Sequence, residues 1–233
     1  MARPTALLIA GGADYHNTPE HYELLAGLLA GPAGLNLTVT DSLAEQTEAD
    51  LRRYDLLALW ATIGDPPAAP VAALFGAVRR GTPLLGIHAA PFTVRRVEGG
   101  PEAIGALYLP WPHLPYQETT ISVYVPGHPI TQGVEPFRIT DELYCLEPRG
   151  EGVQVLAGYD GTAADAPFRG DPRPGHDEAH AWRLRQPRAP LLYTKRLGAG
   201  KVHVNALGHD GAALRHPAFR RLIVQGVGWL LDP

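Results

Sequence analysis

The sequence predicts a single α/β domain over residues 1–233, with a doubly wound, mostly parallel sheet and an antiparallel extension. Two observations predict this fold. In the first half, short apolar segments alternate with helical ones, a pattern that gives right-handed crossovers and a parallel sheet covered by helices on both faces. In the second half, segments of alternating polarity are separated by glycine and proline, which is typical of antiparallel strands.

The first half is expected to run β-α-β-α-β-α-β. Thr5–Ala10 is a continuous apolar run closed by two glycines, as in a parallel strand buried on both faces. Pro19–Ala30 has apolar residues at helical spacing and ends before Gly31. The elements expected next are a strand at Leu35–Thr40, a helix at Glu48–Arg53, a strand at Asp55–Ala61, a helix at Pro70–Arg80 and a strand at Thr82–Ile87.

The second half is expected to form the antiparallel extension and a closing helix. Gly99–Pro115 is rich in glycine, proline and aromatic residues and shows little periodicity, and Asp160–Asp177 is expected to be a long surface loop. The glycine-containing segment 198–200 predicts a hairpin. The expected strands are Thr119–Val125, Val153–Tyr159, Ala179–Leu184, Leu191–Leu197 and Lys201–Ala206, and the helix is Ala218–Leu231.

Composition and charge exclude several classes of protein. With 45% hydrophobic residues, the chain can bury a sizeable core. A net charge of −4 argues against a nucleic-acid partner, and a single cysteine excludes a disulfide framework. The apolar segments are far shorter than the roughly 20 residues that span a bilayer. No signal peptide is recognisable. We therefore expect a cytoplasmic protein with no membrane partner, whose hairpin and last helix would suit a homodimer.

Histidines follow several predicted strands where a ligand would bind. In doubly wound sheets, ligands lie outside the carboxyl ends of the strands. His16, His88 and His209 each stand after such a strand, and imidazole serves as acid, base or metal ligand near neutral pH. A single loop histidine more often only bonds a backbone carbonyl, but three histidines at one edge favour a site.

Residues 86–90, Gly-Ile-His-Ala-Ala, have the form of a nucleophile elbow. Small residues permit a sharp turn between strand and helix that keeps the central side chain exposed. The central residue is His88, which suits acid–base chemistry and makes a poor nucleophile for a durable acyl intermediate. A plain tight turn is the alternative interpretation.

Other candidates lie between residues 110 and 146. Asp141 and Glu142 beside Tyr144 suit sugar hydroxyls or a general base, although helix capping or pairing with arginine is equally compatible. Cys145 is expected to be a small buried hydrophobic residue. We predict His88 and His209 as the acid–base pair, with Glu142 as base or hydroxyl ligand. The residues predicted to bind the substrate are Tyr15, His16, Trp111, His113, Asp141, Tyr144 and Asp210.

The sequence requires no cofactor and assigns no metal ligand. His176 and His180 are four residues apart, but they lie in and after a segment rich in glycine and proline. Two alternatives stay open beside the enzyme. One is a binding or assembly module without turnover. The other is a metal-dependent hydrolase that holds a divalent ion with the dispersed residues His16, His88, Glu142 and His209.

Several segments together resemble the ThuA-like, or trehalose-utilisation, family. They are Gly-Ile-His-Ala-Ala at 86–90, His-Pro-Ile-Thr-Gln-Gly at 128–133, Asp-Glu-Leu-Tyr at 141–144, Gly-Ala-Gly-Lys-Val at 198–202, Leu-Gly-His-Asp at 207–210 and the closing segment 226–230. That family is similar in fold to class I glutamine amidotransferases, so the resemblance implies a flavodoxin-like sheet. It also implies a role in carbohydrate use, through 3-keto sugars made by a partner dehydrogenase.

The resemblance separates this chain from the glutaminases. Amidotransferases carry a cysteine at the elbow, where this chain has His88. We therefore expect a protein that acts on a sugar or keto-sugar derivative by histidine acid–base chemistry, as an isomerase, lyase or hydrolase. Its expected partner is that small molecule.

Overall fold

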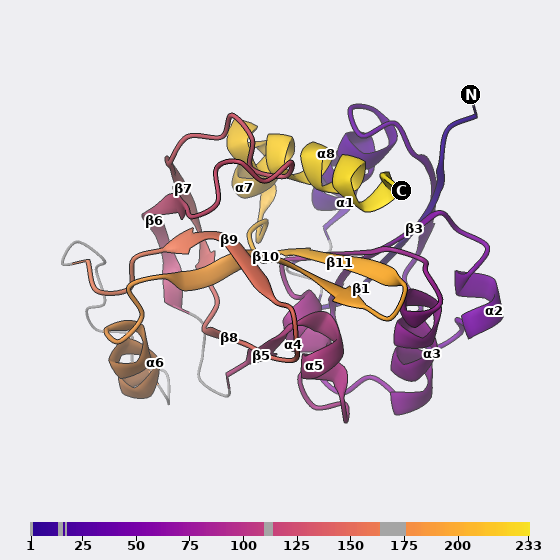
Figure 1. The fold of residues 1–233 in the computed structure, drawn as a ribbon, viewed down its shortest axis with the longest axis horizontal. Coiled ribbons are helices and arrows are strands. Elements are labelled where there is room, and N and C mark those ends of the chain that lie inside the picture. Colours follow the sequence, from indigo (N-terminus) through magenta and orange to yellow (C-terminus); the bar gives the residue numbers. More distant parts are fainter. Residues whose placement is uncertain (1, 14–15, 17, 110–113, 164–175) are drawn as a thin grey trace.

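The computed structural model describes residues 2–13, 16, 18–109, 114–163 and 176–233 (Figure 1). Its strands are β1 (Thr5–Gly12), β2 (Asn36–Thr40), β3 (Leu56–Thr62), β4 (Leu84–Ile87), β5 (Ala106–Tyr108), β6 (Leu114–Val123), β7 (Phe137–Leu143), β8 (Leu146–Pro148), β9 (Gln154–Tyr159), β10 (Ala189–Leu197) and β11 (Gly200–Asn205). Its helices are α1 (Pro19–Ala30), α2 (Glu48–Leu51), α3 (Ala68–Arg79), α4 (Ala90–Val94), α5 (Gly100–Ile104), α6 (His176–Arg183), α7 (Gly211–Arg215) and α8 (Pro217–Leu231).

The main sheet has nine strands in the order β2-β1-β3-β4-β11-β10-β9-β6-β7, and β5 and β8 form a separate antiparallel pair. The strands from β2 to β11 are parallel. From β11 to β7, each neighbouring pair is antiparallel. Because these four reversals restore the original direction, β7 runs the same way as β11. The carboxyl ends of β1, β3, β4, β11 and β7 therefore point to the same side.

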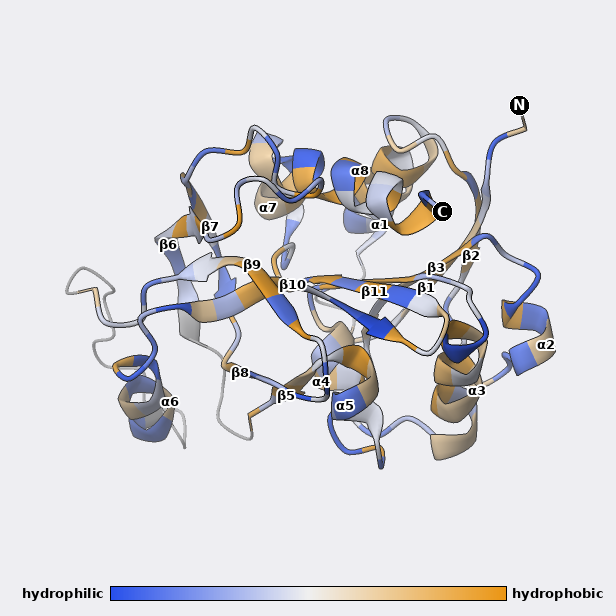
Figure 2. Cartoon of the chain, viewed as in Figure 1, coloured by the Kyte–Doolittle hydropathy of each residue, from blue (hydrophilic) through white to orange (hydrophobic). Residues whose placement is uncertain are grey.

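Helices cover both faces of the parallel strands. Helices α1, α7 and α8 lie over one face, and α3, α4 and α5 lie over the other (Figure 1). Residues 6–10 of β1 and 56–60 of β3 are at most 2% exposed. Hydrophilic residues predominate on the outlying helix α6 (Figure 2). The continuous apolar runs of the first half are thus explained by strands that are covered from both sides.

The predicted fold class is confirmed. The first seven elements occur in the predicted order, and α1 has the predicted bounds. The antiparallel extension is also present, with β10 and β11 paired on either side of the glycine-containing turn. Gly198 in this turn has φ +60°, a backbone conformation that side chains other than glycine rarely adopt.

The strand predicted at Ala179–Leu184 is wrong, because these residues belong almost entirely to α6. Ala179 and Trp182 are buried while Glu178 and Ala181 are exposed, which is a helical period and not the two-residue alternation of a strand. Asp177 and Glu178 in the first turn stabilise the helix by interacting with the positive end of its dipole. His176 and His180 therefore both lie on this helix.

Other differences concern short elements. Gly99–Pro115, expected to be irregular, contains α5 and β5, and α4, α7, β7 and β8 were not predicted. The elements α4, α5, α7, β5 and β8 span three to five residues each, too few for a periodic pattern to emerge, whereas β7 has seven residues. Most of the surface loop predicted at Asp160–Asp177 lies outside the described residues, at positions 164–175.

His203 on β11 makes the stability of the fold depend on pH. Its ring is fully buried, and its Nδ1–H donates to the Tyr193 carbonyl oxygen at 3.0 Å. Burial disfavours the imidazolium and lowers the pKa of His203 from 6.5 to about 4. Between these values the unfolded chain binds a proton that the folded protein does not. We expect this residue to reduce the free energy of unfolding by up to about 1.4 kcal/mol for each pH unit of acidification in that window.

Urea unfolding of wild type and His203→Gln at about pH 7 and about pH 4.5 measures this contribution. The wild type is expected to lose more stability on acidification than the variant. Other titrating groups are common to both proteins, so the difference between the two pH dependences isolates His203. Equal pH dependences would contradict the prediction.

Candidate active site at the carboxyl edge of the sheet

The turn after β4 is sharp, as its sequence predicted. Among the described residues, His88 is the one non-glycine residue with a positive φ, at +46°. The turn also requires a small residue before it, since a Cβ on Gly86 would lie 2.9 Å from the Val204 side chain. The backbone N–H of His88 donates to Asn205 O at 2.9 Å, which ties the turn to β11. Strand, sharp turn and helix α4 thus form an elbow, although the imidazole at its centre is fully buried.

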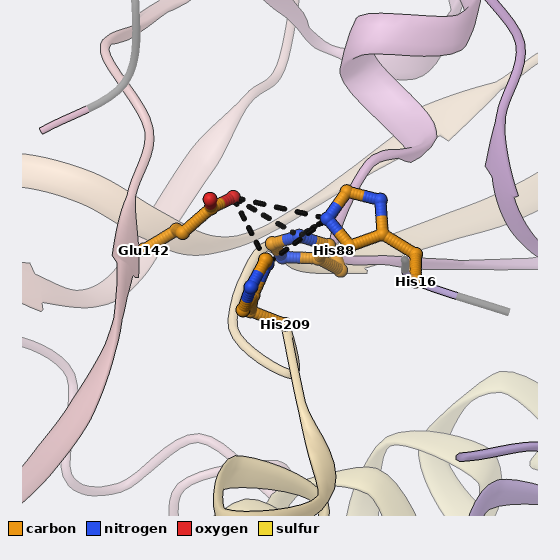
Figure 3. A group of neighbouring side chains, drawn as sticks. All are labelled: His16, His88, Glu142 and His209. Carbon is orange, nitrogen blue, oxygen red and sulfur yellow. Dashed lines mark hydrogen bonds and ion pairs between the residues drawn. The ribbon is translucent and has the colours of Figure 1, made fainter. Parts of the chain in front are cut away.

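Four side chains from distant parts of the sequence converge beside this elbow (Figure 3). His16 follows β1, His88 follows β4, His209 follows β11, and Glu142 lies near the end of β7. Their ligand atoms all lie within 4.8 Å of one another. The predicted convergence of the three histidines is confirmed and Glu142 joins them, while the catalytic role of each residue stays a prediction.

The contacts within this cluster are close. His16 Nε2 lies 2.9 Å from His209 Nδ1 and 3.3 Å from His88 Nε2. Glu142 Oε2 lies 3.1 Å from His209 Nδ1, 3.5 Å from His88 Nε2 and 3.9 Å from His16 Nε2. The Tyr144 hydroxyl is 2.8 Å from His88 Nε2, and the two rings stack with centroids 4.7 Å apart.

In His88 and His16, the ring nitrogen that faces away from the cluster, Nδ1, contacts an oxygen atom of a neighbouring segment. His88 Nδ1 lies 3.3 Å from the Ala206 carbonyl oxygen, which can only accept a hydrogen bond. His16 Nδ1 lies 2.7 Å from Thr62 Oγ1, at the end of β3. These partners orient the rings so that their Nε2 atoms face the centre of the cluster.

Asp141 joins β7 to the loop that carries His209. Its Oδ2 accepts the backbone N–H of Gly208 at 2.7 Å, and its Oδ1 accepts those of His209 at 3.1 Å and Glu142 at 2.8 Å. The side chain is fully buried. Asp141 therefore positions two members of the cluster through their backbones, and its predicted contact with a substrate stays a prediction.

His21, which sequence reasoning did not single out, makes a similar link. Its Nδ1 donates to His16 O at 2.9 Å, and its Nε2 accepts the backbone N–H of Gly211 at 3.0 Å. One imidazole thus connects the segments that carry His16 and His209. Its position within the first turns of α1, just after a site segment, was the available signal. Thr62, at a strand end, was a second residue missed in this way.

Asp210 forms its hydrogen bonds outside the cluster. Its Oδ1 accepts the backbone N–H of Ala213 and begins α7, and its Oδ2 accepts the hydroxyl of Tyr116 at 2.6 Å. The carboxylate that meets the His209 ring is that of Glu142. Tyr116 is 45% exposed and its ring lies 5.7 Å from that of His209, so solvent reaches the cluster's neighbourhood on this side.

The surroundings of His88 and His209 shift the pKa values of these two residues in opposite directions. Burial lowers the pKa of His88 to about 4, against the opposing influence of Glu142. Burial acts in the same direction on His209, but the hydrogen bond and charge of Glu142, with Asp141 and Asp210, outweigh it and raise the pKa of His209. Burial also raises the pKa of Asp141 to about 7, although three backbone N–H groups favour its charged form.

Of the remaining candidate residues, the structure describes Tyr144 and Cys145. Tyr144 is buried against His88 as given above, and Cys145 is buried as predicted. Burial raises the pKa of the Cys145 thiol to about 12. Tyr15, Trp111 and His113, predicted to bind the substrate, lie outside the described residues.

Comparison with known families decides the classification of the chain. The family model for ThuA, described as trehalose utilisation, matches residues 5–230. The chain belongs to the ThuA family. This confirms the resemblance that the sequence motifs indicated. A comparison with curated protein sequences finds no match.

Solved structures similar to this ThuA-family protein show the same fold. A ThuA-like protein from Bacteroides uniformis has a TM-score of 0.74 at 17% identity, covering 98% of this chain and 91% of the other. One from Parabacteroides merdae has a TM-score of 0.71 at 18% identity, covering 99% and 90%. A cytoplasmic protein from Salmonella typhimurium reaches 0.62 at 14%, covering 97% and 98%. In the part of this chain that the structure describes, no helix is both long and apolar enough to cross a membrane.

Proposed function

We propose that this ThuA-family protein acts on a small sugar or keto-sugar derivative, with proton transfers that depend on His88, His209 and Glu142. The convergence of these side chains at the carboxyl edge of the sheet carries the proposal. The family's description as trehalose utilisation supports the substrate class. Removing a proton next to a carbonyl group needs a positioned base and a group that stabilises the oxygen where charge develops.

The cluster offers one pair of groups for each task. Glu142 and His209, 3.1 Å apart, form the pair that takes the proton from the carbon next to the keto group. The Tyr144 hydroxyl, 2.8 Å from His88 Nε2, is the donor for the keto oxygen as it gains negative charge. The product is an enol. Taking a proton on the former keto carbon gives an isomer of the substrate, and expelling a neighbouring substituent gives the elimination product of a lyase reaction.

The surroundings of Cys145 support a route without a thiol nucleophile. The side chain is 1% exposed, and burial raises the pKa of its thiol to about 12. A thiol nucleophile reacts as the thiolate, which such a site strongly disfavours. Cys145 therefore does not replace the cysteine that glutaminases use.

Proton NMR in D₂O tests the proposal with 3-keto derivatives of trehalose and of other disaccharides. We expect the wild type to exchange the proton next to the keto group, or to form an isomer or elimination product. His209→Gln and Glu142→Gln are expected to lower this rate by about 10²–10⁴-fold, the contribution typical of general acid–base groups.

His128→Gln is the matched control, because His128 packs against Trp229 and not within the cluster. It should retain the wild-type rate. Substrates left unchanged by the wild type, or cluster variants that work at the wild-type rate, would contradict the proposed function.

A further inference from the structure

The cluster has the composition and geometry of a metal site. Three imidazole nitrogens and one carboxylate oxygen face one another, and the described residues contain no second group of this kind. We propose that His16, His88, His209 and Glu142 bind one divalent transition-metal ion of the zinc class.

The distances between the ligand atoms suit a tetrahedral ion. Zinc binds nitrogen and carboxylate oxygen at about 2.0–2.2 Å, which places neighbouring ligand atoms about 3.3 Å apart. Five of the six pairwise distances run from 2.9 to 3.9 Å and so lie on both sides of this value, and the sixth, between the His88 and His209 nitrogens, is at most 4.8 Å. A tetrahedral ion therefore requires the His88 and His209 nitrogens to come within about 3.3 Å of each other.

The partners on the outer side of the rings favour metal binding. Because the Ala206 carbonyl oxygen accepts from His88 Nδ1–H, the neutral ring presents the lone pair of Nε2 to the centre. Thr62 Oγ1 holds His16 in the corresponding orientation through its Nδ1. Metal-binding histidines are commonly oriented in this way by a hydrogen bond to the other ring nitrogen.

The donor set and its burial select the class of ion. Imidazole suits zinc, copper, nickel and iron, whereas calcium and magnesium prefer ligand sets made of oxygen. The side chains of His88, His16 and Glu142 are 0%, 5% and 10% exposed, and that of His209 is 20% exposed. A cation at the centre compensates the buried carboxylate and satisfies the nitrogen lone pairs that water reaches poorly.

Tyr144 competes with an ion for one ligand atom. Its hydroxyl lies 2.8 Å from His88 Nε2 and donates to the lone pair that a metal ion needs. Removing this hydroxyl therefore leaves the ligand free, so Tyr144→Phe should bind the ion at least as tightly as the wild type. A variant that removes a true ligand must have the opposite effect.

Metal binding goes beyond the proposed function. With four protein ligands, a bound ion would act as a Lewis acid toward a keto or hydroxyl oxygen by taking that oxygen as a fifth ligand. His209 and Glu142 would then hold the ion instead of taking a proton from the substrate. Binding is measured without any sugar, so the two proposals fail separately. Turnover by protein freed of metal with a chelator would overturn a catalytic role for the ion, and tight metal binding without turnover would overturn the proposed function alone.

Titration of the full chain without an affinity tag tests the proposal. After chelation and dialysis, Zn²⁺ is added in competition with a chromophoric chelator, and Co²⁺ is added to record its visible absorption. We expect one Zn²⁺ per chain and the intense bands of four-coordinate Co²⁺, with no response to Mg²⁺. His88→Gln, His209→Gln and Glu142→Gln should each bind Zn²⁺ about 100-fold more weakly or worse, since losing even an outer partner of a ligand costs about 10–100-fold.

His128→Gln should bind like the wild type, and far-UV circular dichroism confirms folding. If a ligand variant does not fold, X-ray absorption of the zinc-loaded wild type decides by counting imidazole ligands. Three imidazoles and one oxygen support the proposal. A wild type that retains no zinc, fewer than three imidazoles, or folded ligand variants that bind like the wild type would overturn it.

Discussion

Replacing His88 with asparagine is expected to lower turnover of a confirmed substrate by about 10²–10⁴-fold while the protein still folds. The imidazole is lost, and with it the contacts to Tyr144, His16 and Glu142. The backbone at this position has φ +46°, and asparagine tolerates the left-handed region better than other non-glycine residues. The loss of activity should therefore exceed anything that reduced stability explains.

His88→Val is the matched comparison. A β-branched residue is strained at a positive φ, so this variant should be less stable than His88→Asn by about 1–2 kcal/mol. Initial rates by NMR and urea unfolding of both variants measure the two effects. An asparagine variant with the wild-type rate, or one that is no more stable than the valine variant, would show that the elbow does not work as described.

Asp141→Asn is expected to lower the free energy of unfolding by about 1–3 kcal/mol, the cost of a buried hydrogen-bonding group left unsatisfied. The two carboxylate oxygens accept three backbone N–H groups, those of Glu142, Gly208 and His209. An amide has one oxygen, so its NH₂ group must face at least one of these donors. Because the loop carrying His209 then loses its anchor to β7, turnover should fall as well.

The matched control is Asp65→Asn. Asp65 is exposed, and its ion pair with Arg96 at 2.9 Å lies on the surface. Such pairs contribute little, so its unfolding free energy should stay within about 1 kcal/mol of the wild type. Urea unfolding compares both variants, and His209→Gln in the Asp141→Asn background tests the link. If Asp141→Asn were as stable and as active as the control, the hydrogen bonds from Asp141 on β7 to the loop that carries His209 would be unnecessary for stability and turnover.

The parallel half of the fold was predictable because its signals are local. An apolar strand needs a run of buried side chains, and α1 needs only helical spacing, Thr18 as its N-cap and Gly31 after its end. The failure at α6 is instructive, since Ala179 and Trp182 pack their face of the helix only after distant segments have come together. Strand β7, which bears Glu142, was also missed, because its seven residues alternate in polarity only over the first four and then continue with two carboxylates.

The histidines of the site were predictable because carboxyl ends of neighbouring parallel strands share an edge. Because His16, His88 and His209 each follow such a strand, their order along the chain predicts that they lie near one another. Glu142 was recognised from its motif, but its approach to the histidines depends on four antiparallel pairings between β11 and β7. No local pattern specifies how many reversals separate two strands.

Residue order along the chain was enough to establish the doubly wound architecture, the turn at His88 and the edge where chemistry can occur. The three-dimensional arrangement alone established that Glu142 meets the histidines, that Asp141 and His21 tie their loops together, and that four ligand atoms share one centre. The physical reason is the distance along the chain over which each interaction acts. Hydrophobic periodicity and turn chemistry act over a few neighbours, whereas hydrogen bonds between segments up to 195 residues apart exist only after folding.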